Sequence, residues 1–349
     1  MSWAVVRDPA TVREVLRRHD DFAPTNALTS VVPLHPATLR ALSRVGFTLP
    51  PVLASATGAR HQAVRRVVAR FFTPEKVAAV RPRVLALTRA HCERVAEQLR
   101  TGDADLTSVA GAVPPVIMSE LIGLPLPELP LLKRWSQDSL ELFWGWPDPA
   151  RQLELAASAG EFYGWLREQV AAAADGSLFA ALRPAGVSVT EMCSLGYFLV
   201  IAGQETTAQL TSIVYYRALE EPGWAELADH RLATEFVRRV LAAESPVHTW
   251  RRRAGHDTEL DGRPLPAGAE ILLELSGNHP ADAPATAYSL AFGHGLHRCL
   301  GAKLAEVETV AMLRETARRL PRLRRHGPEP EWLRLLSFRA PRSVRVSGP

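Results

Sequence analysis

The stretch AFGHGLHRCLGAKLAEVE, residues 291–308, places a lone cysteine, Cys299, among three glycines and two histidines. Gly293, Gly295 and Gly301 permit positive φ angles and close approach of the backbone. An amphipathic helical pattern follows at once, so the N-terminal end of the expected helix directs its amide groups and positive dipole end toward the sulfur. Both features favour a thiolate, which acts either as a nucleophile or as a metal ligand.

The other two cysteines, Cys92 and Cys193, lie inside helical patterns and are expected to be small buried hydrophobic residues. Three cysteines in 349 residues argue against a disulfide framework and fit a reducing compartment. No apolar run reaches the roughly 18 residues that a membrane helix requires, and the first residues lack a signal-peptide pattern. We therefore expect a cytoplasmic protein without membrane association.

The formal net charge is +4, and most of the positive charge comes from arginine. Lysine occurs only at Lys76, Lys133 and Lys303. The arginines are spread along helical segments, with neither a basic tail nor an alternation of basic and aromatic residues. The sequence therefore indicates no nucleic-acid partner.

Helical periodicity dominates the chain. Helices are expected over residues 9–22, 59–72, 74–100, 150–174 and 188–221. Strands are expected over residues 3–7, 258–275 and 342–348. Pro82 predicts a break in the third helix, and Ser188 with Glu191 predicts a capping box at the start of the last one. Asp261-Gly262 predicts a hairpin turn. The fold class is therefore mainly α with small sheets.

The cysteine loop closely resembles the haem-ligand loop of bacterial cytochromes P450. The match covers every defining position of Phe292-Gly293-x-Gly295-x-His297-x-Cys299-x-Gly301. The resemblance implies the helical cytochrome P450 fold and haem b as cofactor. It implies that Cys299 is the axial thiolate of the iron, where it donates electron density and favours O–O cleavage. Phe292, Gly293 and Gly301 would then surround the haem, and the role of nucleophile becomes the weaker alternative.

A second motif lies in the expected helix over residues 188–221. The run Ala202-Gly203-x-Glu205-Thr206 resembles the oxygen-activation motif of the same family. Gly203 would leave room beside the haem, and the Thr206 hydroxyl can bond the Ala202 carbonyl one turn back. Glu205 supplies an ionisable proton source next to it. The alternative is a buried helix that merely contains a threonine.

Four cationic positions match those that bind the haem propionates in the family. His61 and Arg65 are four residues apart and share one helix face. Arg252 and His297 occupy the third and fourth positions, although either arginine next to Arg252 would replace it if the register slips. Carboxylates bind best to such cationic donors. The alternative is a set of four solvated surface residues.

The resemblance fails where the family carries a buried Glu-x-x-Arg network. Alignment on the Ser-Pro-Val turn places Arg239 and Ala242 at these two positions. A literal Glu-x-x-Arg occurs one turn earlier, at Glu235 and Arg238, either by accident or as a displaced network. The loop over residues 278–291 is short and lacks the arginine that completes the network. Joint loss of all partners can be nearly neutral, whereas loss of one leaves a stranded charge.

The resemblance covers roughly residues 3–349 and implies a single domain over residues 1–349 that lacks the usual N-terminal helix and strand. It implies an O2-dependent monooxygenase that receives electrons from NAD(P)H through ferredoxin and ferredoxin reductase. Segments 25–54 and 140–147 are apolar and aromatic, which favours a hydrophobic or aromatic small-molecule substrate. The arginine-rich composition is associated with actinobacteria and so favours a role in bacterial specialised metabolism. Two alternatives are a non-catalytic haem-binding recruiting module and a haem-thiolate enzyme of oxidative coupling or redox-neutral rearrangement.

Four basic residues are expected near the thiolate side of the haem. Arg66 and Arg70 lie one turn apart on the helix that carries Arg65, and Arg298 and Lys303 flank the cysteine loop. Together they predict a docking surface for an acidic redox partner. The alternative is an ordinary solvated helix surface.

Overall fold

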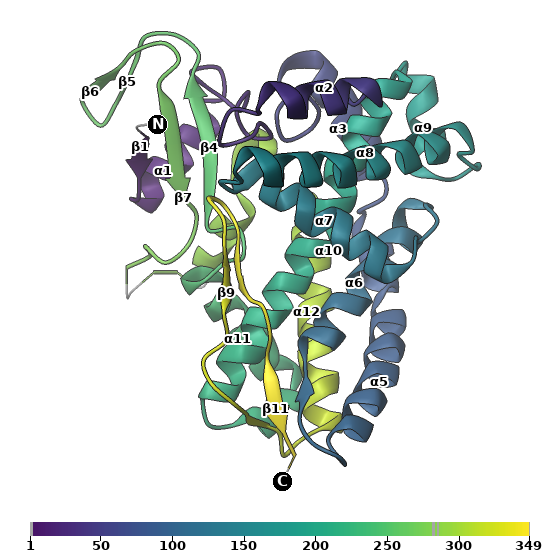
Figure 1. Cartoon of the computed structure of the whole chain (residues 1–349). Helices are drawn as coiled ribbons and strands as arrows, with labels where there is room; N and C mark the ends of the chain where they lie inside the picture. Colours follow the sequence, from purple (N-terminus) through teal and green to yellow (C-terminus); the bar gives the residue numbers. More distant parts are fainter. Residues whose placement is uncertain (1–2, 281–282, 285, 349) are drawn as a thin grey trace.

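The computed structural model describes residues 3–280, 283–284 and 286–348. Helices make up most of the fold, as Figure 1 shows. The α-helices are α1 (Pro9–Arg17), α2 (Pro36–Arg44), α3 (Gly58–Ala69), α4 (Pro74–Ala79), α5 (Arg81–Gln98), α6 (Thr107–Ile122), α7 (Leu129–Trp144), α8 (Pro149–Ala171), α9 (Leu178–Leu182), α10 (Val189–Glu220), α11 (His230–Ala243) and α12 (Ala302–Arg319). The 3₁₀ helices are η1 (Arg183–Ala185), η2 (Trp224–Ala228), η3 (Ala287–Phe292) and η4 (Gly295–His297).

Helix α10 runs through the centre of the molecule and packs against α6, α8 and α12 (Figure 1). Its first turn carries the predicted capping box, in which Ser188 and Glu191 satisfy each other's backbone amides. Its middle is buried on nearly every side, as a central helix must be. The predicted break near Pro82 is also confirmed, because α4 ends at Ala79 and α5 begins at Arg81. Pro82 lies in the first turn of α5, where its missing amide hydrogen costs no intrahelical bond.

The strands form small sheets at two sides of the helical body. They are β1 (Ala4–Val6), β2 (Phe22–Ala23), β3 (Ala104–Asp105), β4 (Thr249–Ala254), β5 (Thr258–Leu260), β6 (Arg263–Leu265), β7 (Glu270–Glu274), β8 (Arg324–Arg325), β9 (Trp332–Arg334), β10 (Arg339–Pro341) and β11 (Arg345–Ser347). The largest sheet has the order β1-β7-β4-β2, with β1 parallel to β7 and the other pairs antiparallel. The predicted hairpin turn joins β5 and β6, and both Asp261 and Gly262 have positive φ. The four-stranded sheet carries Arg252 on β4.

Helices α6 and α7 lie outside the segments that we expected to be helical. Helix α6 contains Pro114 and Pro115 in its interior, where proline removes backbone hydrogen bonds and favours a break. The helix forms nevertheless because both prolines are buried where α6 packs between α5 and α10. Helix α7 starts after Glu128 and leads into the aromatic wall described below. Tertiary packing, rather than local propensity, therefore decides α6.

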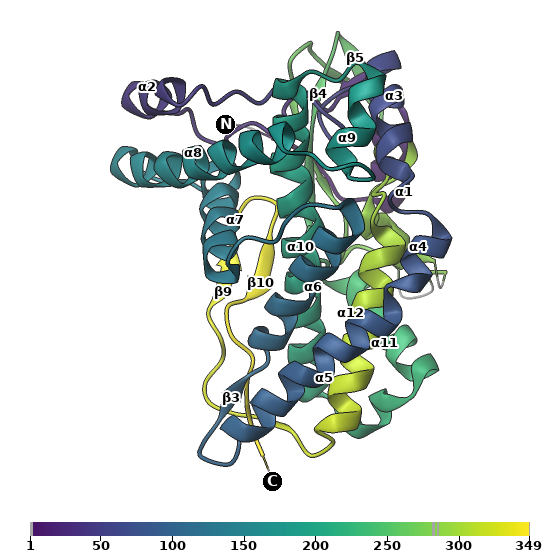
Figure 2. The ribbon, with the colours of Figure 1, turned by 90° about the vertical axis from the view of Figure 1, so that its right-hand side faces the viewer.

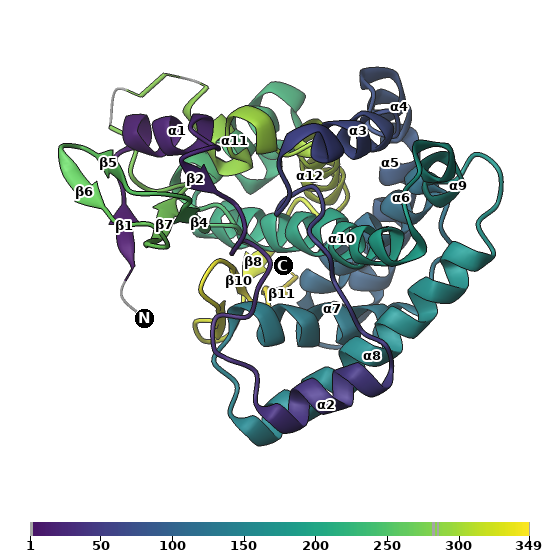
Figure 3. The ribbon, with the colours of Figure 1, turned by 90° about the horizontal axis from the view of Figure 1, so that it is seen from above.

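Helices α2 and α8 lie side by side at the periphery, as Figures 2 and 3 both show. The Gln152 side chain of α8 fixes the start of α2, because its Oε1 accepts a hydrogen bond from the His35 amide at 2.8 Å. The chain that leads from α2 to α3 contacts α10, because the Ser194 hydroxyl donates to the Pro50 carbonyl at 2.7 Å. That path places residues of the expected pocket segment, 25–54, next to the central cavity.

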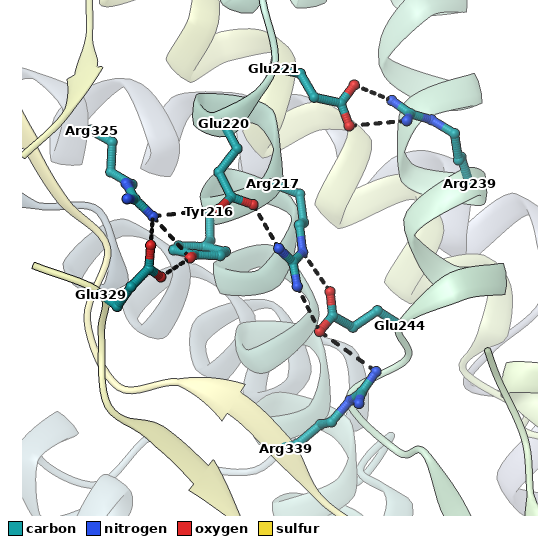
Figure 4. A network of polar contacts seen from close by, with 9 residues as sticks. All are labelled: Tyr216, Arg217, Glu220, Glu221, Arg239, Glu244, Arg325, Glu329 and Arg339. Carbon is teal, nitrogen blue, oxygen red and sulfur yellow. Dashed lines mark hydrogen bonds and ion pairs between the residues drawn. The ribbon is translucent and has the colours of Figure 1, made fainter.

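A network of ion pairs holds the C-terminal end of α10, and Figure 4 shows its members. Arg217 donates to Glu244, which follows α11, at 2.6 Å and to Glu220 at 2.6 Å. Arg339 of β10 lies 3.6 Å from the same Glu244 carboxylate. The network ties α10, α11 and β10 together.

Candidate functional site

A cavity of about 300 Å³ lies between α10 and the loop that carries Cys299. Most of the predicted site residues line it: Arg65, Ala202, Gly203, Thr206, Arg252, Phe292, Gly293, His297, Cys299 and Gly301. These residues come from α3, α10, β4 and the segment between η3 and α12. The fold thus brings together positions that lie more than two hundred residues apart in the sequence.

The cysteine loop is a tight turn held by its own backbone. The Cys299 amide donates to the Phe292 carbonyl at 2.9 Å. Gly293 and Gly295 have φ of 70° and 68°, the left-handed region that glycine adopts without strain. Gly301 differs from our expectation, because its φ is −84° and a Cβ there would lie 3.9 Å from the Cys299 Sγ, an ordinary contact. Two of the three glycines are therefore required by backbone conformation.

The Cys299 side chain is exposed toward the cavity that it lines, while protein atoms surround it on its other sides. Burial raises the pKa of the thiol above its ordinary value. The backbone amide of Gly301 and the charges of Arg65 and Arg298 act in the opposite direction but do not outweigh burial. We expected the glycine loop and the helix end to favour a thiolate, but in the protein without metal the effect of burial is larger. A bound metal ion would deprotonate the sulfur.

Two arginines reach the cavity without an acidic partner among the described residues. Arg252 is only 1% exposed, and its Nη1 donates to the Arg251 carbonyl at 2.8 Å. Burial lowers its pKa to about 10. Arg65 donates to the Arg298 carbonyl at 2.5 Å, and burial lowers its pKa as well. A buried cation without a counter-ion is costly, so this end of the cavity favours an anion.

The structure shows which of the three consecutive arginines on β4 reaches the cavity. The Arg251 guanidinium points away from the cavity and donates to the carbonyls of Ala27 and Thr29 at 3.2 and 2.7 Å. Arg253 is half exposed and donates to Glu270 at 2.8 Å. Among these three arginines, only Arg252 lines the cavity.

Two histidines complete this cationic end. His61 is 1% exposed, and within the described part of the chain neither of its ring nitrogens has a hydrogen-bond partner. Its ring centroid lies 4.8 Å from that of His297. The His297 Nε2 bonds the Ala56 carbonyl at 2.8 Å, whereas its Nδ1 has no partner among the described residues. Burial lowers the pKa of both rings, for His297 to about 4. His61 and Arg252 are buried, and Arg65 and His297 are half-buried, so the alternative of four solvated surface residues is wrong.

Helix α10 lines the cavity on the side opposite the cysteine loop. The Thr206 hydroxyl donates to the Ala202 carbonyl at 2.6 Å, as predicted. Gly203 lines the cavity, but the reason for its small size differs from the one we expected. A Cβ at this position would lie 2.6 Å from the Met118 Sδ of α6. The glycine therefore allows α6 and α10 to pack closely.

Glu205 faces away from the cavity and into a second cleft of about 910 Å³ on the other side of α10. Lys133 of α7 donates to the Glu205 carboxylate at 2.9 Å and to the Gln204 side chain at 2.7 Å. Glu205 itself is 7% exposed. The sequence analysis missed Lys133, because nothing in the local pattern marks its partner 72 residues away.

The literal Glu-x-x-Arg copy is not a displaced network. Glu235 pairs with Arg231 on the protein surface at 3.0 Å, whereas Arg238 points toward α12. Arg239 occupies the position of the family's glutamate. It forms a bidentate ion pair with Glu221 at the end of α10, at 3.0 and 2.7 Å (Figure 4). The reading as an accident of sequence is therefore confirmed, and the hypothesis of a displaced pair is wrong.

Removing the Glu235 side chain is expected to change the free energy of unfolding by about 0.5 kcal/mol or less. The side chains of Glu235 and Arg231 are 60% and 71% exposed, so water already solvates most of both charges. Thermal unfolding of Glu235→Ala checks this. A loss of several kcal/mol, or of bound cofactor, would show that Glu235 belongs to a buried network after all.

Aromatic side chains form part of the cavity wall. Trp144 and Trp250 stack with ring centroids 6.2 Å apart, and Phe338 packs edge-on against Trp144 at 5.0 Å. All three line the cavity together with Phe198. The predicted pocket segments contribute, residues 25–54 through Leu28 and residues 140–147 through Trp144. Trp250 and Phe338 come from segments that the sequence analysis did not assign to the pocket.

Known proteins resemble the chain in sequence and in fold. Cytochrome P450 monooxygenase PikC of Streptomyces venezuelae is 32% identical over 288 residues, which cover 76% of this chain and 67% of that protein. Cytochrome P450 105C1 of a Streptomyces species is 28% identical, over 80% of this chain and 77% of that protein. No sequence profile of a protein family matches.

The solved structure of cytochrome P450 CREJ in complex with (4-ethylphenyl) dihydrogen phosphate has a TM-score of 0.92 to this chain. It is 26% identical in sequence, and the match covers 99% of this chain and 92% of that one. Fold and cavity together define a helical oxidoreductase with a cysteine facing a long central helix. The chain belongs to the cytochrome P450 family, and the predicted fold class is confirmed.

Membership of this family implies a haem, and the residues present fit one. A haem carries two carboxylates, a flat apolar ring and a metal that accepts a thiolate. The cavity offers two arginines without acidic partners among the described residues, the unpartnered ring nitrogens of His61 and His297, and the Cys299 sulfur. Within the described part of the chain, no helix is long and apolar enough to cross a membrane.

Proposed function

We propose that this protein is a haem-thiolate monooxygenase with Cys299 as the axial ligand of the iron. His61, Arg65, Arg252 and His297 would bind the two haem propionates. Cys299, Arg65, Arg252 and His297 line one cavity, and His61 packs against His297; this arrangement carries the proposal. Bound there, haem b would supply the redox chemistry that activates O2 for insertion of one oxygen atom into a substrate.

The loop around Cys299 would hold the sulfur in place for the metal, which would deprotonate it. The Gly301 amide and the charges of Arg65 and Arg298 lower the pKa of the thiol against the effect of burial. The hydrogen bond from the Cys299 amide to the Phe292 carbonyl fixes the backbone. Phe292 and Gly293 line the cavity beside the sulfur, so they would shield it from water.

Thr206 and Glu205 would deliver protons from opposite sides of α10. The Thr206 hydroxyl donates to Ala202, so its oxygen remains free to accept a hydrogen bond on the cavity side. Glu205 lies in the second cleft and is held by Lys133. A proton would enter through this cleft, pass to the Glu205 carboxylate and reach Thr206 within the cavity. The presence of both groups supports catalysis over a recruiting role.

The substrate would be a hydrophobic or aromatic small molecule, oxidised in bacterial specialised metabolism. Aromatic side chains line the cavity, and aromatic ligands gain from stacking and edge-on contacts with such walls. Leu28, Leu140 and Leu199 add aliphatic surface.

Turnover in the presence of isotopically labelled O2 tests the function. The haem-loaded protein, supplied with NADPH, ferredoxin and ferredoxin reductase, is expected to place one labelled oxygen atom in the product. A spectral screen of aromatic and aliphatic ligands selects the substrate for this assay. If the haem is reduced at a normal rate and no selected ligand ever acquires labelled oxygen, the monooxygenase assignment is contradicted.

Reversing Arg66 and Arg70 to glutamate is expected to slow ferredoxin-supported reduction by about tenfold at low salt and to flatten its dependence on ionic strength. Both residues are exposed on α3, where Arg65 reaches the cavity, and neither forms an ion pair within the described residues. Lys303 is the weaker member of the predicted patch, since it already pairs with Glu306 at 3.0 Å. Rapid-mixing measurements of haem reduction check this.

The matched control reverses Arg40 and Arg44. These two exposed arginines also lie four residues apart on one helix, but on the peripheral α2. The net charge of both double variants is the same. Equal reduction rates for the two variants would assign the effect to overall charge and reject a docking surface on α3.

A further inference from the structure

Arg238 of α11 contacts both flanks of the cysteine loop. Its Nη2 donates to the Glu306 carboxylate of α12 at 2.9 Å. Its guanidinium carbon lies 5.0 Å from the centre of the Tyr288 ring in η3, a cation–π distance. Tyr288 precedes Cys299 in the sequence and Glu306 follows it. One side chain therefore connects the segment that enters the loop with the helix that leaves it.

The Glu306 carboxylate is held in place because it is buried and accepts hydrogen bonds from two cationic side chains. It is 7% exposed, and Lys303 donates to the same oxygen at 3.0 Å. Burial alone would raise the pKa of Glu306, but the hydrogen bonds from Lys303 and Arg238 hold it below the ordinary value. Loss of one cation would leave a buried charge with a single partner, which is costly.

The two positions of α11 where the family carries its Glu-x-x-Arg network provide no other side chain that could hold the cysteine loop. Arg239 is exposed and paired with Glu221 at the far end of α10, and Ala242 has no polar side chain. The sequence between Asn278 and Ala291 contains no arginine. Helix α11 nevertheless packs closely on both η3 and α12. Of the charged groups in α11 that could act on the loop, Arg238 is the one that contacts it from both sides.

We propose that Arg238, through Glu306 and Tyr288, is a positioning residue that holds the cysteine loop in the shape required for thiolate ligation. The inference rests on the proposed role of Cys299 as the haem ligand. It assigns to one arginine the work that a three-membered buried network performs elsewhere in the family. An ordinary surface ion pair would contribute little, and the test is built to separate these two roles.

Amide hydrogen exchange gives a readout that needs no turnover. The amides of Gly293 and Cys299 donate to the Leu290 and Phe292 carbonyls within the loop. In Arg238→Ala, exchange at both is expected to be about tenfold faster, because a charge-assisted hydrogen bond and a cation–π contact are lost. Arg239→Ala is the matched control, since it removes a neighbouring ion pair of the same helix without touching the loop. Equal exchange in the two variants would overturn the proposal.

The carbon monoxide spectrum of the reduced holoprotein supplies the second readout. Arg238→Ala is expected to lose thiolate-ligated haem in favour of the short-wavelength form, while Arg239→Ala keeps the spectrum of the parent. Arg238→Lys, which keeps the charge but not the flat group over Tyr288, should lie between them. If the parent itself lacks the thiolate band, the proposed function fails. If the parent has the band and Arg238→Ala keeps all of it, only the positioning role fails.

A double-variant comparison tests whether Arg238 acts through Glu306. Arg238→Ala combined with Glu306→Gln should be no more impaired than the worse of the two single variants, because both remove the same contact. Additive effects on loop exchange would show that the residues act independently and would contradict the proposal.

Discussion

Replacing Cys299 by histidine is expected to abolish the long-wavelength Soret band that thiolate-ligated haem shows when reduced and bound to carbon monoxide. The imidazole can still coordinate iron, so haem content need not fall in proportion, but the electron donation by sulfur is lost. Monooxygenation should fall to background, because O–O cleavage depends on that donation. The spectrum and the product yield of the haem-loaded variant check both statements. Retention of the band in Cys299→His would exclude Cys299 as the ligand.

The other two cysteines provide the control. Cys92 and Cys193 are buried in helices, as predicted, and burial raises the pKa of both thiols, for Cys92 to about 11. Neither lines the central cavity, to judge from the residues described around it. Cys193→Ala removes only a small hydrophobic group, so this variant should keep the band of the parent.

Replacing Thr206 by alanine is expected to lower product formation by about 10²–10⁴-fold at nearly unchanged haem content. The hydroxyl lines the cavity and belongs to no tertiary network, because it bonds only the Ala202 carbonyl of its own helix turn. Reducing equivalents should then leave as peroxide. The ratio of product to consumed NADPH measures this directly, and Thr206→Ser, which keeps a hydroxyl, should recover much of the coupling.

Ser212→Ala is the matched control for Thr206→Ala. Ser212 lies on the same helix and donates to the Ala208 carbonyl at 3.0 Å, the same bond to the preceding turn. It borders the second cleft instead of the cavity. If both variants uncouple equally, loss of the helix-internal bond explains the effect, and Thr206 has no role in proton delivery.

The parts of the site that could be predicted from sequence are those built from consecutive residues. The turn of Gly293 and Gly295, the bond from Thr206 to Ala202 and the capping box at Ser188 depend on neighbours within a few positions. The shared face of His61 and Arg65 follows from helical spacing alone. Local geometry fixes such features, so a single sequence contains the information.

The parts that could not be predicted depend on contacts between distant segments. Met118 fills the space beside Gly203, and Lys133 turns Glu205 toward the second cleft. Neither contact has a local signature. Helix α6 was not among the expected helices, and its interior prolines are tolerated because burial against α5 and α10 overrides their propensity.

Two opposing effects act on the pKa of the Cys299 thiol. The amide of Gly301 and the charges of Arg65 and Arg298 lower it, as the sequence suggested. Burial of the thiol raises it by more. A bound metal would deprotonate the thiol, so thiolate formation would be coupled to cofactor binding.

The spectrum of the unaltered protein tests the central claim most directly. The purified chain, loaded with haem, reduced and exposed to carbon monoxide, should show the long-wavelength Soret band of a haem bound through a thiolate. A chain that binds no haem, or that shows only the short-wavelength band of a haem without thiolate ligation, would contradict the account.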